Sequence, residues 1–157
     1  NKDSRGQWGV SFNNTEGDLK AKNCDMLYPP NLVCENENKV NTFVSMGKNG
    51  FPYHFYRDFG EYSVSGFSEY SSKLKNRYKV IKSPTKEERE KFIFGKKELI
   101  YYYKNQEENS KKPLYISLYT RTLGSLRTIY IGYYSKNYFE NEILSALKKK
   151  KKKEDDL

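Results

Sequence analysis

Short segments that alternate apolar and polar residues constrain the fold of this chain more than any other feature. Turn residues separate seven such segments, which are residues 40–46, 52–59, 61–70, 76–82, 98–105, 114–120 and 126–134. In 114–120, for example, leucine and isoleucine alternate with tyrosine and serine. A period of two places successive side chains on opposite faces of a β-strand. The pattern therefore predicts seven short strands, joined mostly by hairpin turns.

Two segments predict helices instead. Residues 83–97 form the longest connection between strands, and the acidic residues after Pro84 are typical of a helix start. Near the C-terminus, Asn137 suits an N-cap with Glu140 three residues on. The apolar residues that follow recur every four positions, at Phe139, Ile143 and Leu147. We expect a short helix between the fourth and fifth strands and a C-terminal helix that packs on the sheet.

The length of 157 residues fits one domain with one hydrophobic core. Aromatic residues make up 16% of the chain, and their rings suit the half-buried surface of a sheet. The predicted strands and C-terminal helix define a domain over residues 37–150. Residues 1–36 are expected to be an N-terminal extension that packs on this domain through Trp8, and residues 151–157 a charged tail.

The charge distribution favours an anionic partner. The net charge is +9, although the first 36 residues carry four basic and five acidic residues. The excess therefore lies in the body and the tail, where the lysine run 148–153 complements the negative end of the predicted helix. Membrane lipid, nucleic acid and acidic protein surfaces are the partner classes that such a balance indicates.

The chain has two cysteines, Cys24 and Cys34, and no Cys-x-x-C pair, which argues against a structural zinc site. Their spacing is compatible with a small disulfide loop and with two reduced thiols in a cytosolic protein. We interpret them as reduced. No pattern predicts a cofactor or a metal site.

Seven strands followed by one helix is the element order of the pleckstrin homology domain. Residues 98–105 resemble a central strand of that family, 127–135 its last strand and 139–147 its final helix, although Ile143 stands where the family usually has Trp. The resemblance covers residues 38–150 and implies a seven-stranded β-barrel or sandwich capped by one α-helix. The Asn-, Lys- and Tyr-rich composition is also similar to that of the acylated pleckstrin-homology proteins of apicomplexan parasites, which sense phosphatidic acid.

The resemblance also implies a lipid-binding site. In the family, the loops after strands one, three and six meet at one open end of the barrel. Basic residues in these loops would bind headgroup phosphates, contributing about 1 kcal/mol each, while apolar loop tips enter the bilayer interface. The residues implied here are Lys48, Phe51, Lys73, Lys75, Arg77, Arg121, Leu123 and Arg127.

These patterns predict a membrane-lipid-binding module, not an enzyme. The single histidine, His54, lies in an aromatic strand and is interpreted as structural, and no nucleophile–base spacing is evident. The expected partner is an anionic phospholipid membrane, with phosphatidic acid favoured. The chain is expected to be monomeric, cytoplasmic and peripheral on a membrane.

Two alternatives remain open. A secreted lipocalin-like or protease-associated β-barrel that binds a ligand or protein would suit Gly6-Gln7-Trp8 and a Cys24–Cys34 disulfide. Nucleic-acid binding, with aromatic rings as stacking platforms, ranks third because most of the aromatics alternate as core residues do.

Overall fold

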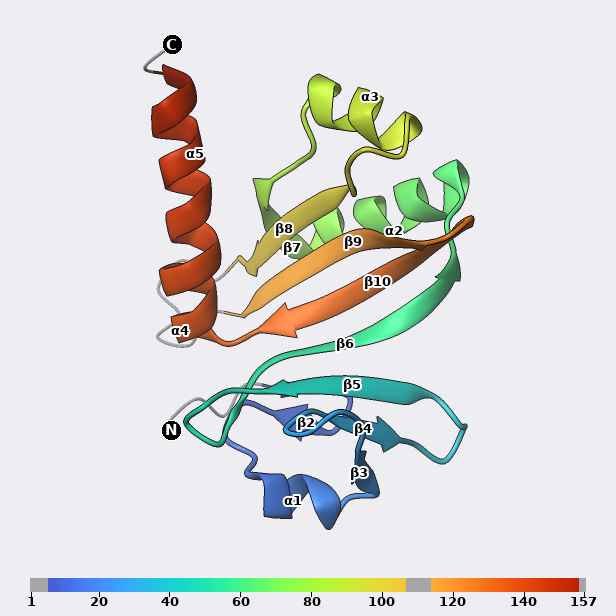
Figure 1. Ribbon diagram of the computed structural model, residues 1–157, viewed down its shortest axis with the longest axis vertical. Coiled ribbons are helices and arrows are strands. Elements are labelled where there is room, and N and C mark those ends of the chain that lie inside the picture. The colour runs from blue at the N-terminus through green and yellow to red at the C-terminus, as the bar shows by residue number, and fades with distance from the viewer. Residues whose placement is uncertain (1–5, 107–113, 156–157) are drawn as a thin grey trace.

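An antiparallel sheet of eight strands forms the centre of the computed structural model, which describes residues 6–106 and 114–155 (Figure 1). The strands are β3 (Cys24–Met26), β4 (Leu32–Glu35), β5 (Asn41–Met46), β6 (Pro52–Glu61), β7 (Tyr78–Lys82), β8 (Ile100–Asn105), β9 (Tyr115–Leu123) and β10 (Leu126–Tyr134). Their order across the sheet is β3-β4-β5-β6-β10-β9-β8-β7. The edge strands β3 and β7 do not pair with each other, so the sheet is open. A mainly β fold with a C-terminal helix is confirmed, but the predicted closed barrel is not formed.

The predicted third strand, 61–70, is wrong. Most of that segment belongs to helix α2 (Val64–Arg77), whose N-cap Ser63 accepts a hydrogen bond from the Gly66 amide at 3.0 Å. Phe67 is buried in the core, and Tyr70 and Leu74 pack against it at helical spacing. The helical period is visible only when Leu74 is included, and the predicted segment ends at Tyr70. The alternation of small and aromatic residues within 61–70 was therefore interpreted as a strand.

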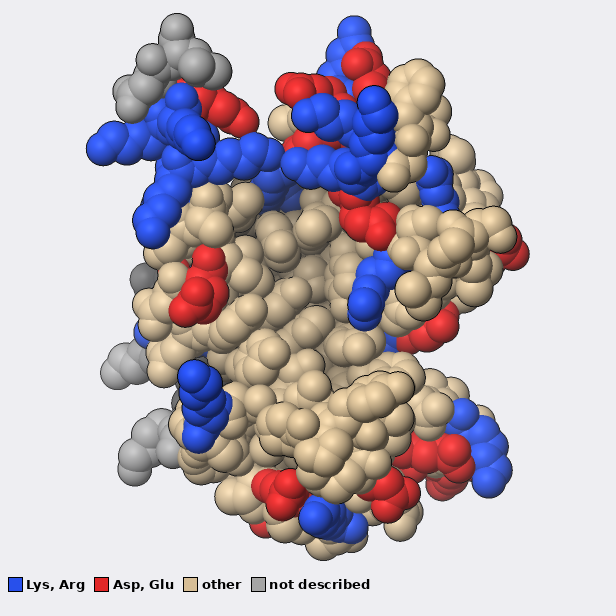
Figure 2. Space-filling model, viewed as in Figure 1, with Lys and Arg blue, Asp and Glu red and all other residues tan. Residues whose placement is uncertain are grey.

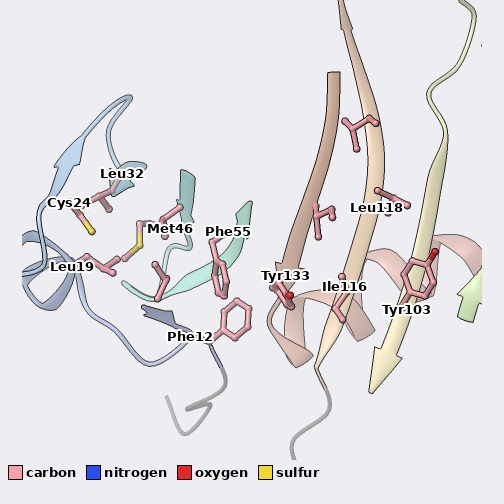
Figure 3. Close-up of a cluster of buried hydrophobic side chains, with 14 of the residues drawn as sticks. Phe12, Leu19, Cys24, Leu32, Met46, Phe55, Tyr103, Ile116, Leu118 and Tyr133 are labelled. Carbon is pink, nitrogen blue, oxygen red and sulfur yellow. The ribbon is translucent and has the colours of Figure 1, made fainter. Parts of the chain in front are cut away.

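The main core lies on one face of the sheet, which we call the inner face and define by Val44, Phe55, Ile131, Leu118 and Tyr103. The register places these residues opposite one another or two positions apart across neighbouring strands. Four of them are 0–1% exposed, and Figure 3 shows several gathered into one layer. α2 covers this face over β8, with Phe67 and Tyr101 in ring contact at 5.8 Å.

The N-terminal residues cover the rest of the inner face. They form a hairpin of β1 (Gly6–Gln7) and β2 (Val10–Ser11), followed by α1 (Glu16–Lys20). The Trp8 ring meets that of Tyr133 at 5.1 Å, and the fully buried Phe12 meets Phe55 at 4.9 Å. This segment therefore completes the core, and β3 and β4 extend the main sheet.

Two further helices follow the expected pattern. α3 (Lys86–Ile93) is the short helix predicted between the fourth and fifth strands, and Thr85 and Glu88 form its capping box. At the C-terminus, α4 (Lys136–Tyr138), the π-helical turn η1 (Phe139–Leu144) and α5 (Ser145–Asp155) follow one another without a break. The N-cap is Ser135, two residues before the predicted cap Asn137, and it accepts a hydrogen bond from the Tyr138 amide at 3.3 Å.

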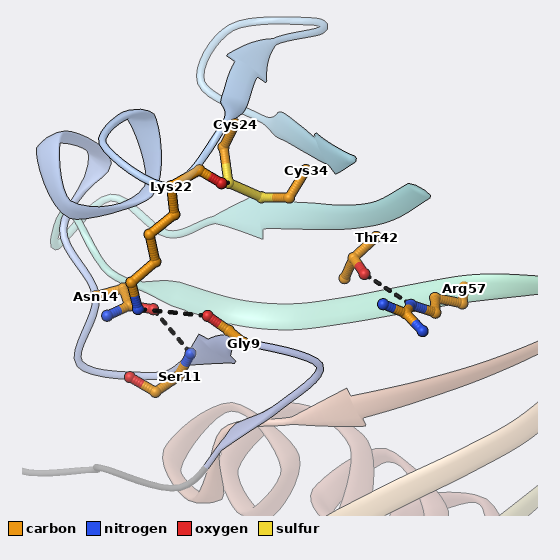
Figure 4. The surroundings of a disulfide bond; sticks show 8 residues. All are labelled: Gly9, Ser11, Asn14, Lys22, Cys24, Cys34, Thr42 and Arg57. Atoms are coloured by element: carbon orange, nitrogen blue, oxygen red, sulfur yellow. Dashed lines mark hydrogen bonds between the residues drawn. A yellow bond between two sulfur atoms is a disulfide. The ribbon is translucent and has the colours of Figure 1, made fainter. Parts of the chain in front are cut away.

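A disulfide joins Cys24 to Cys34, so the interpretation of reduced cysteines is wrong (Figure 4). The two residues lie directly opposite each other on β3 and β4. Nearby, Lys22 Nζ donates to the Gly9 carbonyl at 3.4 Å, which connects this edge of the sheet to the N-terminal hairpin. The sequence allowed both a disulfide and two thiols, and the β3–β4 pair that brings the cysteines together was not predicted because all seven predicted strands lie after residue 37.

Candidate binding surfaces

The structure separates the residues that were predicted to form one lipid site. Tyr134 pairs with His54 at one end of the β6–β10 ladder, and Thr128 pairs with Glu61 at the other. Lys48 and Phe51 lie in the β5–β6 turn, beside His54, whereas Arg121, Leu123 and Arg127 lie at the Glu61 end. The two loops therefore do not meet.

The third predicted group is part of α2 rather than of a loop. Lys73, Lys75 and Arg77 occupy its C-terminal half, and Lys73 forms an ion pair with Glu69 at 3.0 Å. α2 leads into Tyr78, which pairs with Asn105, and this end of the sheet lies away from the β9–β10 hairpin. Phe51 is half-buried and is not an exposed loop tip.

Arg127 holds three elements together at the hairpin end of the sheet. Its guanidinium donates to the Phe92 carbonyl at 2.9 Å and lies 4.2 Å from the centre of the Phe92 ring, at the end of α3. Its own carbonyl accepts a hydrogen bond from the Tyr62 amide at 2.7 Å, just before α2. Arg127 is therefore engaged in the fold, which leaves less of its charge for a ligand.

Large exposed apolar side chains surround this junction. They come from the β9–β10 hairpin, the start of α2 and the end of α3, and their exposed fractions range from 51% to 76%. Figure 1 shows the β9–β10 hairpin, the start of α2 and the end of α3 on the same side of the molecule. We call this surface the apolar tip; it consists of Val64, Ile93, Phe94, Leu123 and Leu126.

Charged residues flank the apolar tip. Arg121 is exposed two residues before Leu123, and Lys96 is exposed two residues after Phe94. Glu61 at the end of β6 and Glu90 on α3 are also exposed, as is Arg89, so the acidic residues offset only part of the positive charge. Glu98 stiffens the hairpin, because its carboxylate accepts a hydrogen bond from the Thr122 amide at 2.7 Å.

The opposite face of the sheet, the outer face, is aromatic and largely uncharged. We define it by His54, Tyr56, Tyr119, Tyr130 and Tyr134, which share this face by register. Figure 2 shows a broad uncharged surface over these strands, with lysines and arginines gathered over α3 and α5. Burial raises the pKa values of Tyr119 and Tyr134, so both side chains stay neutral at physiological pH.

His54 lies inside this aromatic layer. Its ring stacks on Tyr134 at 4.1 Å, with an angle of 4° between the planes, and on Tyr56 at 5.0 Å. Burial, with a smaller effect of the nearby Arg121, lowers the pKa of His54 to about 3. A ring held neutral in a buried stack suits packing better than proton transfer near neutral pH.

Within residues 6–106 and 114–155, no three His, Cys, Asp or Glu side chains are arranged to hold a metal ion. The helices in these ranges are too short or too polar to cross a membrane. No protein-family model, no curated protein and no solved structure matches this chain.

Sequence reasoning identified Leu123 and Arg121 but missed four members of the apolar tip. Ile93 and Phe94 close α3 outside its buried stripe, where only Phe92 faces the core. Two adjacent apolar residues at the end of a charged helix were the available signal. Val64 was hidden because its segment was interpreted as a strand.

Proposed function

We propose that this chain is a non-enzymatic binding module that docks on a phospholipid membrane surface through the apolar tip. The observation that carries the proposal is that five large exposed apolar side chains lie on the β9–β10 hairpin, the start of α2 and the end of α3, segments that the contacts of Arg127 bring together. Contiguous exposed apolar surface marks a membrane or protein interaction site. The projecting arrangement of a hairpin and two helix ends favours shallow insertion into a bilayer over contact with a flat protein surface.

The mechanism combines insertion and phosphate contact. A large apolar side chain contributes about 1.5–3 kcal/mol when it moves fully from water to an apolar phase, and shallow insertion yields about half of that. A basic residue near an anionic surface adds about 1 kcal/mol, a part suited to Arg121. Together these contributions give roughly −6 kcal/mol, a dissociation constant in the tens of micromolar.

Phosphatidic acid remains the favoured lipid. The basis is the sequence alone, which resembles the pleckstrin homology family but has no intact phosphoinositide-binding motif of that family. The open sheet adds no argument for the family. Because Glu61 and Glu90 offset part of the positive charge around the apolar tip, the preference for anionic over neutral lipid is expected to be modest.

The disulfide bears on the location of this membrane surface. Disulfides persist in oxidising compartments and are rare in the cytosol. The Cys24–Cys34 bond therefore favours a surface that faces such a compartment over the cytoplasmic location expected from the sequence.

Vesicle flotation tests the proposal directly. The intact chain is mixed with phosphatidylcholine vesicles alone, or with phosphatidic acid, phosphatidylserine or phosphoinositide added. We expect binding that is strongest with phosphatidic acid, and a loss of about tenfold for Leu123→Ser/Leu126→Ser. Leu27→Ser/Val40→Ser is the matched control, because it removes two exposed apolar residues from elsewhere on the molecule.

Equal binding of the two double variants would overturn the role of the apolar tip. No binding to any vesicle would overturn membrane docking altogether.

That second result would support a different candidate, a disulfide-bonded domain that binds a partner protein through the tyrosine-rich outer face. The disulfide favours this candidate, and tyrosine is enriched at protein interfaces.

A further inference from the structure

A groove separates α3 from α5, away from the apolar tip. Its volume is about 640 Å³, which lies in the usual range for small-molecule sites. Figure 2 shows a hollow between the two helices, with lysines and arginines gathered around it. The apolar residues that line it are Ile81 on β7 and Leu144 and Leu147 on the C-terminal helix.

The rim of the groove is strongly basic. Seven lysines and three glutamates line it, together with the apolar residues above and Thr85. The lysines are Lys82, Lys86, Lys91, Lys97, Lys148, Lys150 and Lys151, and the glutamates are Glu87, Glu88 and Glu154. An apolar surface beneath an excess of ammonium groups is complementary to a molecule with an acyl chain and an anionic head.

Glu88 organises part of this rim. Its carboxylate contacts Lys82 Nζ at 2.7 Å, Lys97 Nζ at 3.0 Å and Lys150 Nζ at 3.9 Å. Burial alone would raise the pKa of Glu88, but the hydrogen bonds from Lys82 and Lys97 outweigh it and hold the pKa at about 2. One carboxylate thus serves three ammonium groups and leaves positive charge uncompensated.

Lys91 forms an ion pair with Glu87 at 2.9 Å, but the other three rim lysines have less compensation. Among the described residues, no carboxylate lies within ion-pair distance of Lys86, Lys148 or Lys151. The neighbouring Lys97 lowers the pKa of the Lys150 ammonium, as expected where like charges crowd together. A bound anion would relieve that repulsion.

We propose that the groove binds a single-chain anionic amphiphile. The acyl chain lies along Ile81, Leu144 and Leu147, and the carboxylate or phosphate head contacts the lysines of α5, chiefly Lys148 and Lys151. This site is separate from the apolar tip and does not depend on membrane docking.

The test is a fluorescence titration of the intact chain with a dansyl-labelled fatty acid, kept below its micellar concentration. We expect saturable binding in the micromolar range, and binding of the corresponding methyl ester that is weaker by about tenfold, because the ester lacks the charged head. Dodecyl phosphate is expected to compete with the probe, whereas inorganic phosphate at the same concentration is not.

α5 offers a matched pair of variants. Lys148→Ser/Lys150→Ser/Lys151→Ser removes three lysines that line the groove, and Lys149→Ser/Lys152→Ser/Lys153→Ser removes three that do not. Both triples lower the charge of the same helix equally, and circular dichroism checks the fold of each. We expect about tenfold weaker binding for the first triple and less than about twofold change for the second.

Three results would overturn the proposal. Equal losses in the two triples would reduce the effect to the net charge of the helix. An ester that binds as tightly as the acid would remove the role of the lysines. Full competition by inorganic phosphate would indicate an anion site without an acyl chain. Vesicle flotation of the apolar-tip variants does not depend on the groove. The membrane-docking proposal and the groove proposal can therefore be contradicted separately.

Discussion

Gly132 makes room for the buried imidazole of His54 at the centre of the outer face. A Cβ atom at position 132 would lie 2.5 Å from His54 Nε2 and 3.1 Å from the Tyr56 Cβ. Because His54 is stacked on Tyr134, its ring has little room to move aside. We expect Gly132→Ala to lower the free energy of unfolding by about 1–3 kcal/mol, as overpacking does elsewhere.

Urea unfolding measures this effect, and Gly17→Ala provides the control. A Cβ at Gly17 would meet its nearest neighbour at 3.8 Å, an ordinary contact, so that variant should match the parent or exceed it. Truncating the histidine in His54→Ala/Gly132→Ala should recover part of the loss. A Gly132→Ala variant as stable as the parent would show that the histidine ring is not confined.

His54 also makes stability depend on pH. Its pKa is about 3 in the folded state against 6.5 when unperturbed, so the unfolded chain binds the proton first. The stabilisation is complete above about pH 6.5 and falls by about 1.4 kcal/mol per pH unit below it. Glu88, whose pKa falls from 4.5 to about 2, adds its own loss only below about pH 4.5.

The variant His54→Phe keeps an aromatic ring in the stack and removes the titrating group. Between about pH 6.5 and pH 5, we expect its free energy of unfolding to change much less than that of the parent protein. Chemical denaturation at several pH values in this window compares the two slopes. Parallel slopes would mean that His54 does not control the acid sensitivity.

At the scale of elements, the sequence predicts strands well where alternation and burial agree. Six of the seven predicted segments contain strands. Burial alternates clearly in β5, whereas the central β9 is buried on both faces from Tyr115 to Leu118. α2 was missed because serine and glycine in its first turns blur the helical period. β3 and β4 were missed because they are only three and four residues long, too short to show a pattern.

The candidate site was less predictable, for a reason that lies in the topology. The sequence shows Leu123 as an apolar residue beside a predicted turn. Apart from Leu126 in the same hairpin, the other residues of the apolar tip come from α2 and from the end of α3. Lys48 was predicted to lie beside Leu123 because the corresponding loops meet at one end of the closed barrel of the pleckstrin homology family. In this open sheet, β6 and β10 run antiparallel side by side and place the two turns at opposite ends.

The disulfide stabilises the short β3–β4 pair at the edge of the sheet. It closes a loop with a sequence separation of 10, for which the chain-entropy relation gives about 2–3 kcal/mol. We expect Cys24→Ser/Cys34→Ser to lose stability of this order, and the parent protein to show no titratable thiol unless reduced. Two reactive thiols in the unreduced, unfolded protein would contradict the bond and return the chain to a cytosolic setting.

At the scale of the whole molecule, the N-terminal segment and the sheet share one core and should unfold together. Trp8, the only tryptophan of the chain, is a probe placed where they meet. Its ring contacts Tyr133 at 5.1 Å, and the Arg57 guanidinium lies 4.6 Å from its centre. We expect tryptophan fluorescence and far-ultraviolet circular dichroism to report the same denaturation midpoint.

Phe12→Ala, which empties a fully buried position against Phe55, should lower both midpoints together because it removes about 3–5 kcal/mol from the free energy of unfolding. A fluorescence change that precedes the loss of β-structure would instead show that the N-terminal segment detaches on its own and that the sheet retains its fold without it.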